Sequence, residues 1–458
     1  MSTPVVDVPR PAVQPAEPYT FPEAERRTLP NGLEVVVYDV PGQYVHSVRV
    51  SLPLPLAREP RDKEGIATIM ARTLDEGTAN YTSSEFALLL ERKGVALGAG
   101  ASEAGVSVDV DVAKRHLEYA LDLLRQTLTE PSFPAAEVAR HVKQRLAEIE
   151  QERSVAAQRG AIELIATFFD PAERSSRPTA GTRDTVAAIT RDDVAGFHAR
   201  EVSPVGATLI LAGDLDGIDA FAAIQTALGG WTAPQGWEAP PEPVAARTAA
   251  DRGRVVMVDR PGSVQTELVV ATPGPDRRVD GGWSPYPVLG FVLGGSPNAR
   301  VDAVLREEKG YTYGIRSAFR PRRRGGLFLT SGSVRGDVTV EALDILLTIL
   351  DGARQGFTDT ETKQGVDYIA MTAASRYATA DAIADEAAGL AFEGLTTEFT
   401  TATLRDLALV DALRLSDAYR RFADGAWTVI VVGDAAAHAD GIRALTHPVA
   451  QDVTVVSG

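Results

Sequence analysis

The chain is organised around residues 65–76, Gly65-Ile-Ala-Thr-Ile-Met-Ala-Arg-Thr-Leu-Asp-Glu76. Its apolar residues recur at helical spacing, which predicts a helix with one buried face. That face carries Ile66, Ile69, Met70, Thr73 and Leu74. A second face carries Thr68, Ala71, Arg72 and Asp75 at the same spacing. Taken alone, the stretch is an ordinary amphipathic helix, and the rest of the chain must show whether its second face has a function.

The composition is that of a folded, acidic protein. Of 458 residues, 44% are hydrophobic and 24% are charged, which excludes a disordered chain and leaves room for two or more cores. The net charge of −16 argues against nucleic-acid binding. Cysteine is absent, so thiolate metal sites and cysteine nucleophiles are excluded.

No apolar run approaches the ~18 residues of a membrane span, so we expect no membrane association. Residues 1–22 lack the basic start and apolar centre of a signal peptide. They are rich in Pro, Val and Ala, and we expect a flexible N-terminal extension. Together these features predict a cytoplasmic protein.

Short strands and helices alternate after this extension. Residues 33–38 and 45–52 are expected to be strands, and valines alternate with polar residues over 106–112 as in a half-buried strand. Thr82 and Glu85 form a capping-box pattern that begins another helix. The pattern indicates an α+β protein with mainly antiparallel sheets.

Landmarks of the first half recur roughly 220 residues later. The strand that begins at Leu33 has a counterpart at Val255, and Gly213-Asp214 has a counterpart at Gly433-Asp434. Nearly equal offsets in the same order favour a duplicated unit over a chance likeness of two α/β halves.

The chain therefore divides into two homologous α+β units. The first unit is expected over residues 23–228 and the second over 251–458. Residues 229–250 are dense in Pro and Gly and are expected to link them.

Several ordered stretches resemble landmarks of the pitrilysin/insulinase family of inverted zincins. They are Arg27-Thr-Leu-Pro-Asn-Gly-Leu33, Gly65-Ile-Ala67, Asp75-Glu-Gly-Thr78, Gly181-Thr182 through Ile189-Thr190, Leu211-Ala-Gly-Asp214 and Val258-Asp-Arg-Pro-Gly262. The likeness spans about Glu25 to Val455 and is nearest to short members such as the mitochondrial processing peptidase subunits. It implies that the two units together form half of a clam-shell chamber.

In that family, His-x-x-Glu-His on the first helix binds zinc. The matching positions here are Thr68, Ala71 and Arg72, none of which can ligate the metal. The resemblance places the family's distal Glu ligand at Glu148, which could equally belong to a solvated helix face. We expect no metal and no cofactor in this chain.

The second unit keeps another family landmark, Leu305-Arg-Glu-Glu-Lys-Gly-Tyr-Thr-Tyr-Gly314. The resemblance implies that Arg306 and Tyr313 complete an active site from the half that lacks zinc. A guanidinium and a phenol can donate hydrogen bonds to an oxyanion and to a peptide backbone. The alternative is a surface cation and a core aromatic residue.

The resemblance also implies a heterodimer with a homologous subunit that carries His-x-x-Glu-His and the zinc. The two chains would enclose a peptide for proteolytic processing. In the family, the peptide adds a strand beside the metal helix. The stretch that matches this edge here consists of Gly98, Ala99, Gly100 and Ala101, after Leu97.

Two other functions stay open. The chain could be an inactive scaffold or peptide-binding protein of the same fold, in which case Arg306 and Tyr313 would have no catalytic role. A hydrolase of unrelated chemistry finds little support, because the sequence carries no nucleophile elbow, phosphate loop or dinucleotide fingerprint.

Overall fold

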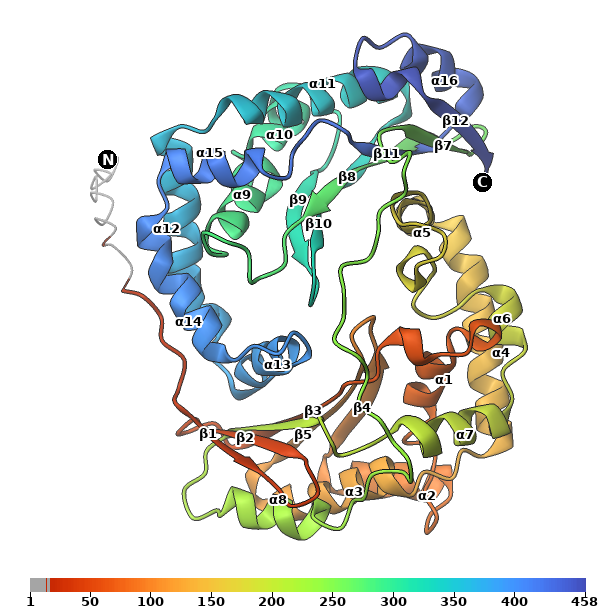
Figure 1. The fold of residues 1–458 in the computed structure, drawn as a ribbon, viewed down its shortest axis with the longest axis vertical. Coiled ribbons are helices and arrows are strands. Elements are labelled where there is room, and N and C mark those ends of the chain that lie inside the picture. Colours follow the sequence, from red (N-terminus) through yellow and green to blue (C-terminus); the bar gives the residue numbers. More distant parts are fainter. Residues whose placement is uncertain (1–13, 15–16) are drawn as a thin grey trace, which may run out of the picture.

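The computed structural model describes residues 14 and 17–458. It contains two six-stranded sheets, each mixed in direction and packed with helices (Figure 1). In spatial order, the first sheet comprises β1 (Ala24–Thr28), β2 (Glu34–Asp39), β6 (Thr208–Gly213), β3 (Val45–Leu52), β5 (Val106–Ala113) and β4 (Ala96–Ala101). The second comprises β12 (Val453–Ser457), β7 (Val255–Asp259), β11 (Thr428–Gly433), β8 (Gln265–Gly274), β10 (Gly326–Arg335) and β9 (Arg316–Pro321).

The strand pairings of the two sheets repeat. Strands β2 and β6 run parallel with Val35 opposite Leu209, and β7 and β11 run parallel with Val255 opposite Val429. Both partners are displaced by the same 220 residues (255 − 35 and 429 − 209). This confirms the two homologous α+β units expected from the sequence.

Turn hydrogen bonds repeat in the same register. The Asp214 carboxylate accepts from the Gly42 amide at 2.7 Å, and the Asp434 carboxylate accepts from the Gly262 amide at 2.8 Å. The sheets differ at one edge, since β1 is antiparallel to β2 whereas β12 is parallel to β7. The first and last strands of the described chain, β1 and β12, thus each form one edge of a sheet, and β4 and β9 form the other edges.

Sixteen α-helices surround these sheets in the described part of the chain. In the first half they are α1 (Ile66–Thr73), α2 (Ser83–Lys93), α3 (Leu117–Thr129), α4 (Ala135–Ser154), α5 (Ala156–Phe168), α6 (Arg183–Ala187), α7 (Arg191–Glu201) and α8 (Ala220–Leu228). In the second half they are α9 (Pro285–Gly294), α10 (Arg300–Asp302), α11 (Thr339–Gly352), α12 (Asp359–Arg376), α13 (Ala380–Phe392), α14 (Thr397–Asp406), α15 (Ala412–Arg420) and α16 (Ala435–Arg443).

The local patterns form as expected. The side chain of Thr82 accepts from the Glu85 amide and Glu85 reciprocates, which completes the capping box of α2. Strand β5 alternates between buried and half-buried positions. Helix α1 buries seven of its eight residues, all except Arg72, against the first core.

The two halves exchange one helix each. Helix α5 follows the first sheet in sequence but packs on the second, where Leu164 and Phe168 join a core with Val269 and Ile430. Helix α13 of the second half packs on the first sheet, where Ile383 and neighbouring alanines meet strands β3 and β6 (Figure 1). Each sheet thus has one apolar face that is covered by a helix from the other half of the chain. The two units are therefore joined through their cores.

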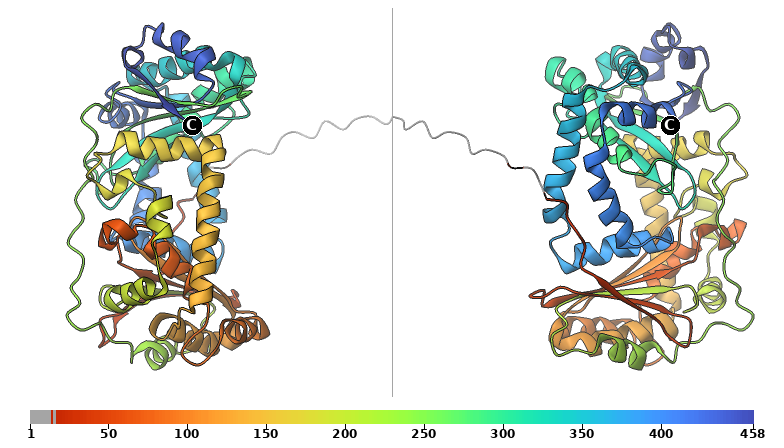
Figure 2. Two further views of the ribbon diagram at one scale, coloured as in Figure 1. Left: turned by 90° about the vertical axis from the view of Figure 1, so that its right-hand side faces the viewer. Right: turned by 60° about the vertical axis from the view of Figure 1, so that its left-hand side comes forward.

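Residues 229–250 run between the two halves without forming a helix or a ladder of strands (Figure 2). The expected extension, residues 1–22, falls largely outside the described residues. Its last part is in contact with the second half, because Tyr19 and Phe21 pack against Tyr377 with ring centroids 5.5 and 4.6 Å away. None of the described helices is long and apolar enough to cross a membrane.

Candidate functional site

Helix α1 presents the three positions that carry the metal motif in inverted zincins. Thr68 and Ala71 are buried, and the Thr68 hydroxyl has no hydrogen-bond partner. Arg72 lies four residues after Thr68 on the same side of the helix and points toward α4.

A guanidinium–carboxylate network links α1 to α4. The Arg72 Nη1 atom donates to the Glu148 carboxylate at 2.9 Å. Arg145, buried on α4, donates to Glu148 at 3.4 Å and to Glu152 at 2.9 Å. Burial raises the pKa of Glu148, but the hydrogen bonds from Arg72 and Arg145 outweigh it and leave the pKa below its ordinary value.

These residues do not fit a zinc ion. Guanidinium groups already donate to both oxygens of Glu148, and Arg72 brings a positive charge to the place where a dication would bind. Among the described residues, no group of three or more His, Asp or Glu side chains is arranged to hold a metal. The expectation that this chain holds no zinc stays a prediction, and no chemistry at α1 is derived from a metal.

The second candidate site is the loop from Tyr311 to Ile315. Hydrogen bonds hold its backbone on both sides: Thr312 Oγ1 donates to the Ser333 carbonyl at 2.7 Å, and the Ile315 amide donates to buried Asp302 at 2.8 Å. Between these anchors, Tyr313 is 94% exposed. The alternative that Tyr313 is a core aromatic residue is therefore wrong.

Arg306 lies on one turn of π-helix, Ala303–Glu308, just before this loop. Such turns are rare and often occur at functional sites. Its side chain is 39% exposed and approaches Glu307 at 3.5 Å. The two residues lie on neighbouring segments, and no hydrogen bond joins Arg306 to Tyr313 in the described chain.

The four residues expected at a peptide-binding edge lie in β4. Gly98, Ala99, Gly100 and Ala101 pair with β5 alone, opposite Asp109, Val108, Ser107 and Val106. Their side chains are small, and the outer backbone groups of the strand face no further strand of this sheet. This geometry permits strand addition; the substrate-binding role stays a prediction.

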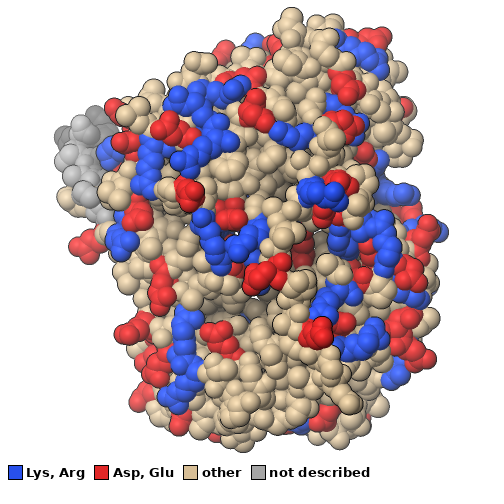
Figure 3. Space-filling view, viewed as in Figure 1, with Lys and Arg blue, Asp and Glu red and all other residues tan. Residues whose placement is uncertain are grey.

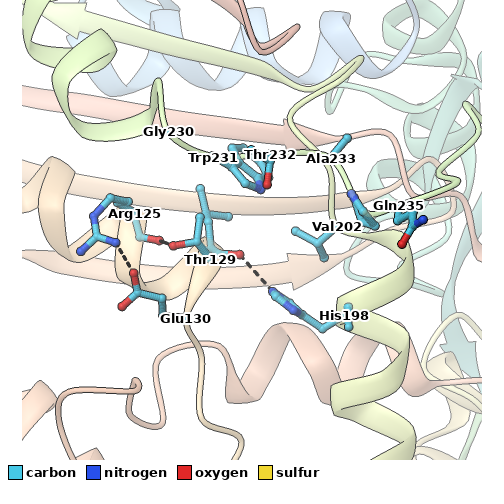
Figure 4. Close-up of a pocket in the computed structure, with 13 residues that line it drawn as sticks. Arg125, Thr129, Glu130, His198, Val202, Gly230, Trp231, Thr232, Ala233 and Gln235 are labelled. Atoms are coloured by element: carbon cyan, nitrogen blue, oxygen red, sulfur yellow. Dashed lines mark hydrogen bonds and ion pairs between the residues drawn. The ribbon is translucent and has the colours of Figure 1, made fainter.

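Two features were not found from the sequence. Asp302 is fully buried and binds the exposed Arg316 at 2.8 Å, a pair for which no sequence pattern is known. A cavity of about 640 Å³ opens between α3, α7 and the start of the linker (Figure 4). His198 faces this cavity, its Nε2 donates to the Leu128 carbonyl at 3.0 Å, and burial lowers its pKa to about 4.

The comparisons with known proteins agree with this architecture. Residues 44–179 match the family Insulinase (Peptidase family M16), and residues 188–367 match Peptidase M16 inactive domain. An uncharacterized zinc protease of Mycobacterium leprae is 26% identical over 305 residues, which span 64% of this chain and 65% of that protein, just under two thirds of its length. The non-peptidase homologue YmxG of Helicobacter pylori is 24% identical over 255 residues, 56% of this chain and 57% of that protein.

Solved structures show the same fold. A peptidase M16 inactive domain from Pseudomonas fluorescens superposes with a TM-score of 0.79 at 20% identity, covering 90% of this chain and 98% of that one. A protease from Helicobacter pylori superposes with a TM-score of 0.82 at 16% identity, covering 90% and 100%. With both family domains in order and the repeated sheets observed here, the chain belongs to the insulinase, or M16, peptidase family.

Proposed function

We propose that this chain is the non-zinc subunit of a heteromeric zinc metalloendopeptidase. Its partner is a homologous subunit with an intact His-x-x-Glu-His motif and the zinc, and the pair encloses a peptide for processing. The cytoplasmic location expected from the sequence is part of this proposal. The zinc protease named among the relatives supports the reaction class, and the residues of α1 support the assignment of the metal to the partner.

The observation that carries the proposal is the exposure of Tyr313. An aromatic side chain that is 94% exposed gains nothing from burial in this chain, yet the backbone on both sides of it is held by hydrogen bonds. Such a loop presents the phenol at low conformational cost, as expected of a group that acts on a bound ligand.

Arg306 and Tyr313 supply the chemistry of hydrogen-bond donors. The phenol donates to an oxygen on which negative charge develops, and the guanidinium donates to the backbone carbonyls of the peptide. Losing one donor of this kind typically lowers a rate by about 10²–10³. In the proposed complex, the edge of β4 from Gly98 to Ala101 forms a wall of the peptide chamber.

The second candidate is an inactive scaffold or peptide-binding protein. One observation favours it: Arg306 approaches Glu307 at 3.5 Å and makes no hydrogen bond to Tyr313 in the described chain. The similarity to a protein named as a non-peptidase homologue points the same way.

Reconstitution separates the two functions. The chain is combined with its zinc-bearing homologue, and cleavage of a quenched fluorescent peptide is measured for Tyr313→Phe and Arg306→Ala. The subunit role predicts a fall in kcat of about 10²-fold for each variant. Matched controls are Tyr368→Phe, an exposed tyrosine on α12, and Arg420→Ala, a half-exposed arginine on α15. Wild-type rates for both site variants would establish the scaffold role.

A further inference from the structure

Asp302 is a charged residue without access to water. Acidic and basic side chains mix on the surface around the central hollow of the face shown in Figure 3. Asp302, at the end of α10, is 0% exposed. A buried carboxylate is unfavourable unless hydrogen bonds and an opposite charge compensate for the lost water. The partners of Asp302 therefore indicate what this residue does in the fold.

Both partners of Asp302 follow Tyr313 in the chain. Its Oδ1 atom accepts a hydrogen bond from the Ile315 amide at 2.8 Å, and its Oδ2 atom binds Nη1 of Arg316 at 2.8 Å. The Ile315 side chain is also fully buried, whereas Tyr313, two residues earlier, is 94% exposed. Asp302 thus fixes the backbone at the point where the loop leaves the surface and enters the core.

Glycines enclose the same stretch of backbone. At Gly294, the last residue of α9, a Cβ atom would lie 3.0 Å from the Ile315 carbonyl oxygen. At Gly332 on β10, a Cβ atom would lie 2.7 Å from the Gly314 carbonyl oxygen. Gly314 itself has φ +152°, a conformation that residues with side chains rarely adopt. The loop therefore has one narrow path between α9 and β10, and Asp302 supplies a hydrogen bond on that path.

The other side of Asp302 leads directly into the turn that carries Arg306. The π-helical turn Ala303–Glu308 begins at the next residue. Its end is tied to the same loop, because the Tyr311 amide donates to the Leu305 carbonyl at 2.8 Å. Hydrogen bonds therefore join the turn and the loop at two places, through Asp302 before the turn and through Leu305 within it.

We propose that Asp302 is a positioning residue that holds the Tyr313 phenol in a fixed place relative to Arg306. This inference rests on the proposed function, in which both of those side chains donate hydrogen bonds during peptide cleavage. Being fully buried, Asp302 touches no substrate and acts through the loop backbone, while Arg316 supplies the opposite charge that its burial requires. A displacement of about 1 Å in a catalytic group can lower a rate by about 10²-fold.

The test uses the complex reconstituted with the zinc-bearing homologue and measures kcat and KM separately. Asp302→Ala removes both interactions, whereas Asp302→Asn keeps an oxygen that can accept from the Ile315 amide. We expect Asp302→Ala to lower kcat by about 30-fold and Asp302→Asn by about fivefold, with KM changed by less than about twofold. The control is Thr428→Val, which removes a buried hydrogen bond of 2.6 Å on β11 and should leave kcat unchanged.

A double-variant comparison separates positioning from a general loss of stability. If Asp302 acts through Tyr313, Asp302→Ala should lower kcat no further when Tyr313→Phe is already present, because the donor that it positions is gone. A residue needed only for stability would lower the rate by the same factor in both backgrounds. If Asp302→Ala does not fold, as judged by circular dichroism, Asp302→Asn undergoes the same comparison.

The outcomes distinguish this role from the function on which it rests. A slow Tyr313→Phe variant with wild-type kcat for Asp302→Ala, or equal losses for Asp302→Ala in both backgrounds, would overturn the positioning role alone. A wild-type kcat for Tyr313→Phe would overturn the proposed function and this role together. A loss for Asp302→Ala that disappears in the Tyr313→Phe background would establish the role.

Discussion

Replacing two residues of α1 should turn the Arg72–Glu148 ion pair into a zinc site. In the variant Thr68→His/Arg72→His, two imidazoles lie at i and i+4 on one side of the helix, with Glu148 reached from α4. Two histidines and one glutamate form a known zinc ligand set. Arg145 also donates to Glu148, at 3.4 Å, but its shorter hydrogen bond at 2.9 Å is to Glu152.

The energy balance favours the rebuilt site. Arg72 and Glu148 are 31% and 28% exposed, so losing their ion pair costs at most about 1 kcal/mol. Zinc at 1,000 times its dissociation constant stabilises a folded protein by about 4 kcal/mol. Zinc should therefore stabilise the variant by about 4 kcal/mol relative to the same variant without zinc, whatever the two substitutions themselves cost.

Urea unfolding with and without zinc measures this gain. Wild type should show no zinc dependence, and Thr68→His/Arg72→His/Glu148→Gln should lose most of the effect. If the double variant folds, as judged by circular dichroism, but its unfolding midpoint ignores zinc, then α1 and α4 do not have the spacing of a metal site and the reasoning fails.

Three further predictions concern stability. The pKa of half-buried His198 is about 4 against 6.5 for the unfolded chain, so the stability that its neutral form contributes is present above pH 6.5 and disappears as the pH falls toward 4. Between pH 7 and pH 5 this titration should lower the free energy of unfolding by about 2 kcal/mol. The variant His198→Gln should show a flatter dependence of the urea midpoint on pH over this range. An unchanged dependence would contradict the effect of burial on His198. Arg322 of the second unit binds Glu103 of the first, and Arg322→Gln should increase hydrogen exchange in both hairpin turns, whereas a change confined to one turn would show that the contact does not join the units. Gly181 has φ +74° and a Cβ atom there would lie 2.2 Å from the Glu64 carbonyl, so Gly181→Ala should lower the free energy of unfolding by about 2–4 kcal/mol; a loss under 1 kcal/mol would mean that the backbone moves freely there.

Local order could be predicted from the sequence because its causes are local. The apolar spacing of α1, the valine alternation of β5 and the capping box of α2 each involve residues within one turn or one strand. The two-unit repeat could be predicted because duplication leaves equal offsets, which the strand registers confirm.

Long-range partners could not be predicted in the same way. The apolar face of α5 indicates that the helix is buried, but it does not indicate that the helix packs on the second sheet. The hydrophobic effect is non-directional and does not specify the partner. An aromatic residue in a glycine-flanked loop can be buried or exposed, and the sequence does not distinguish the two; in the structure Tyr313 is exposed beside the Thr312–Ser333 hydrogen bond. The Asp302–Arg316 ion pair forms because α10 lies close to β9, and no local sequence pattern predicts that the two elements are close.

The most direct test of the subunit role is to purify the tagged chain from its native host and to measure both its companions and its metal. We predict a near-equimolar homologue bearing His-x-x-Glu-His, zinc in that complex, and no zinc in this chain once separated. Recovery of the chain alone, zinc-free and without effect on peptide cleavage, would contradict the account and support a scaffold or peptide-binding role.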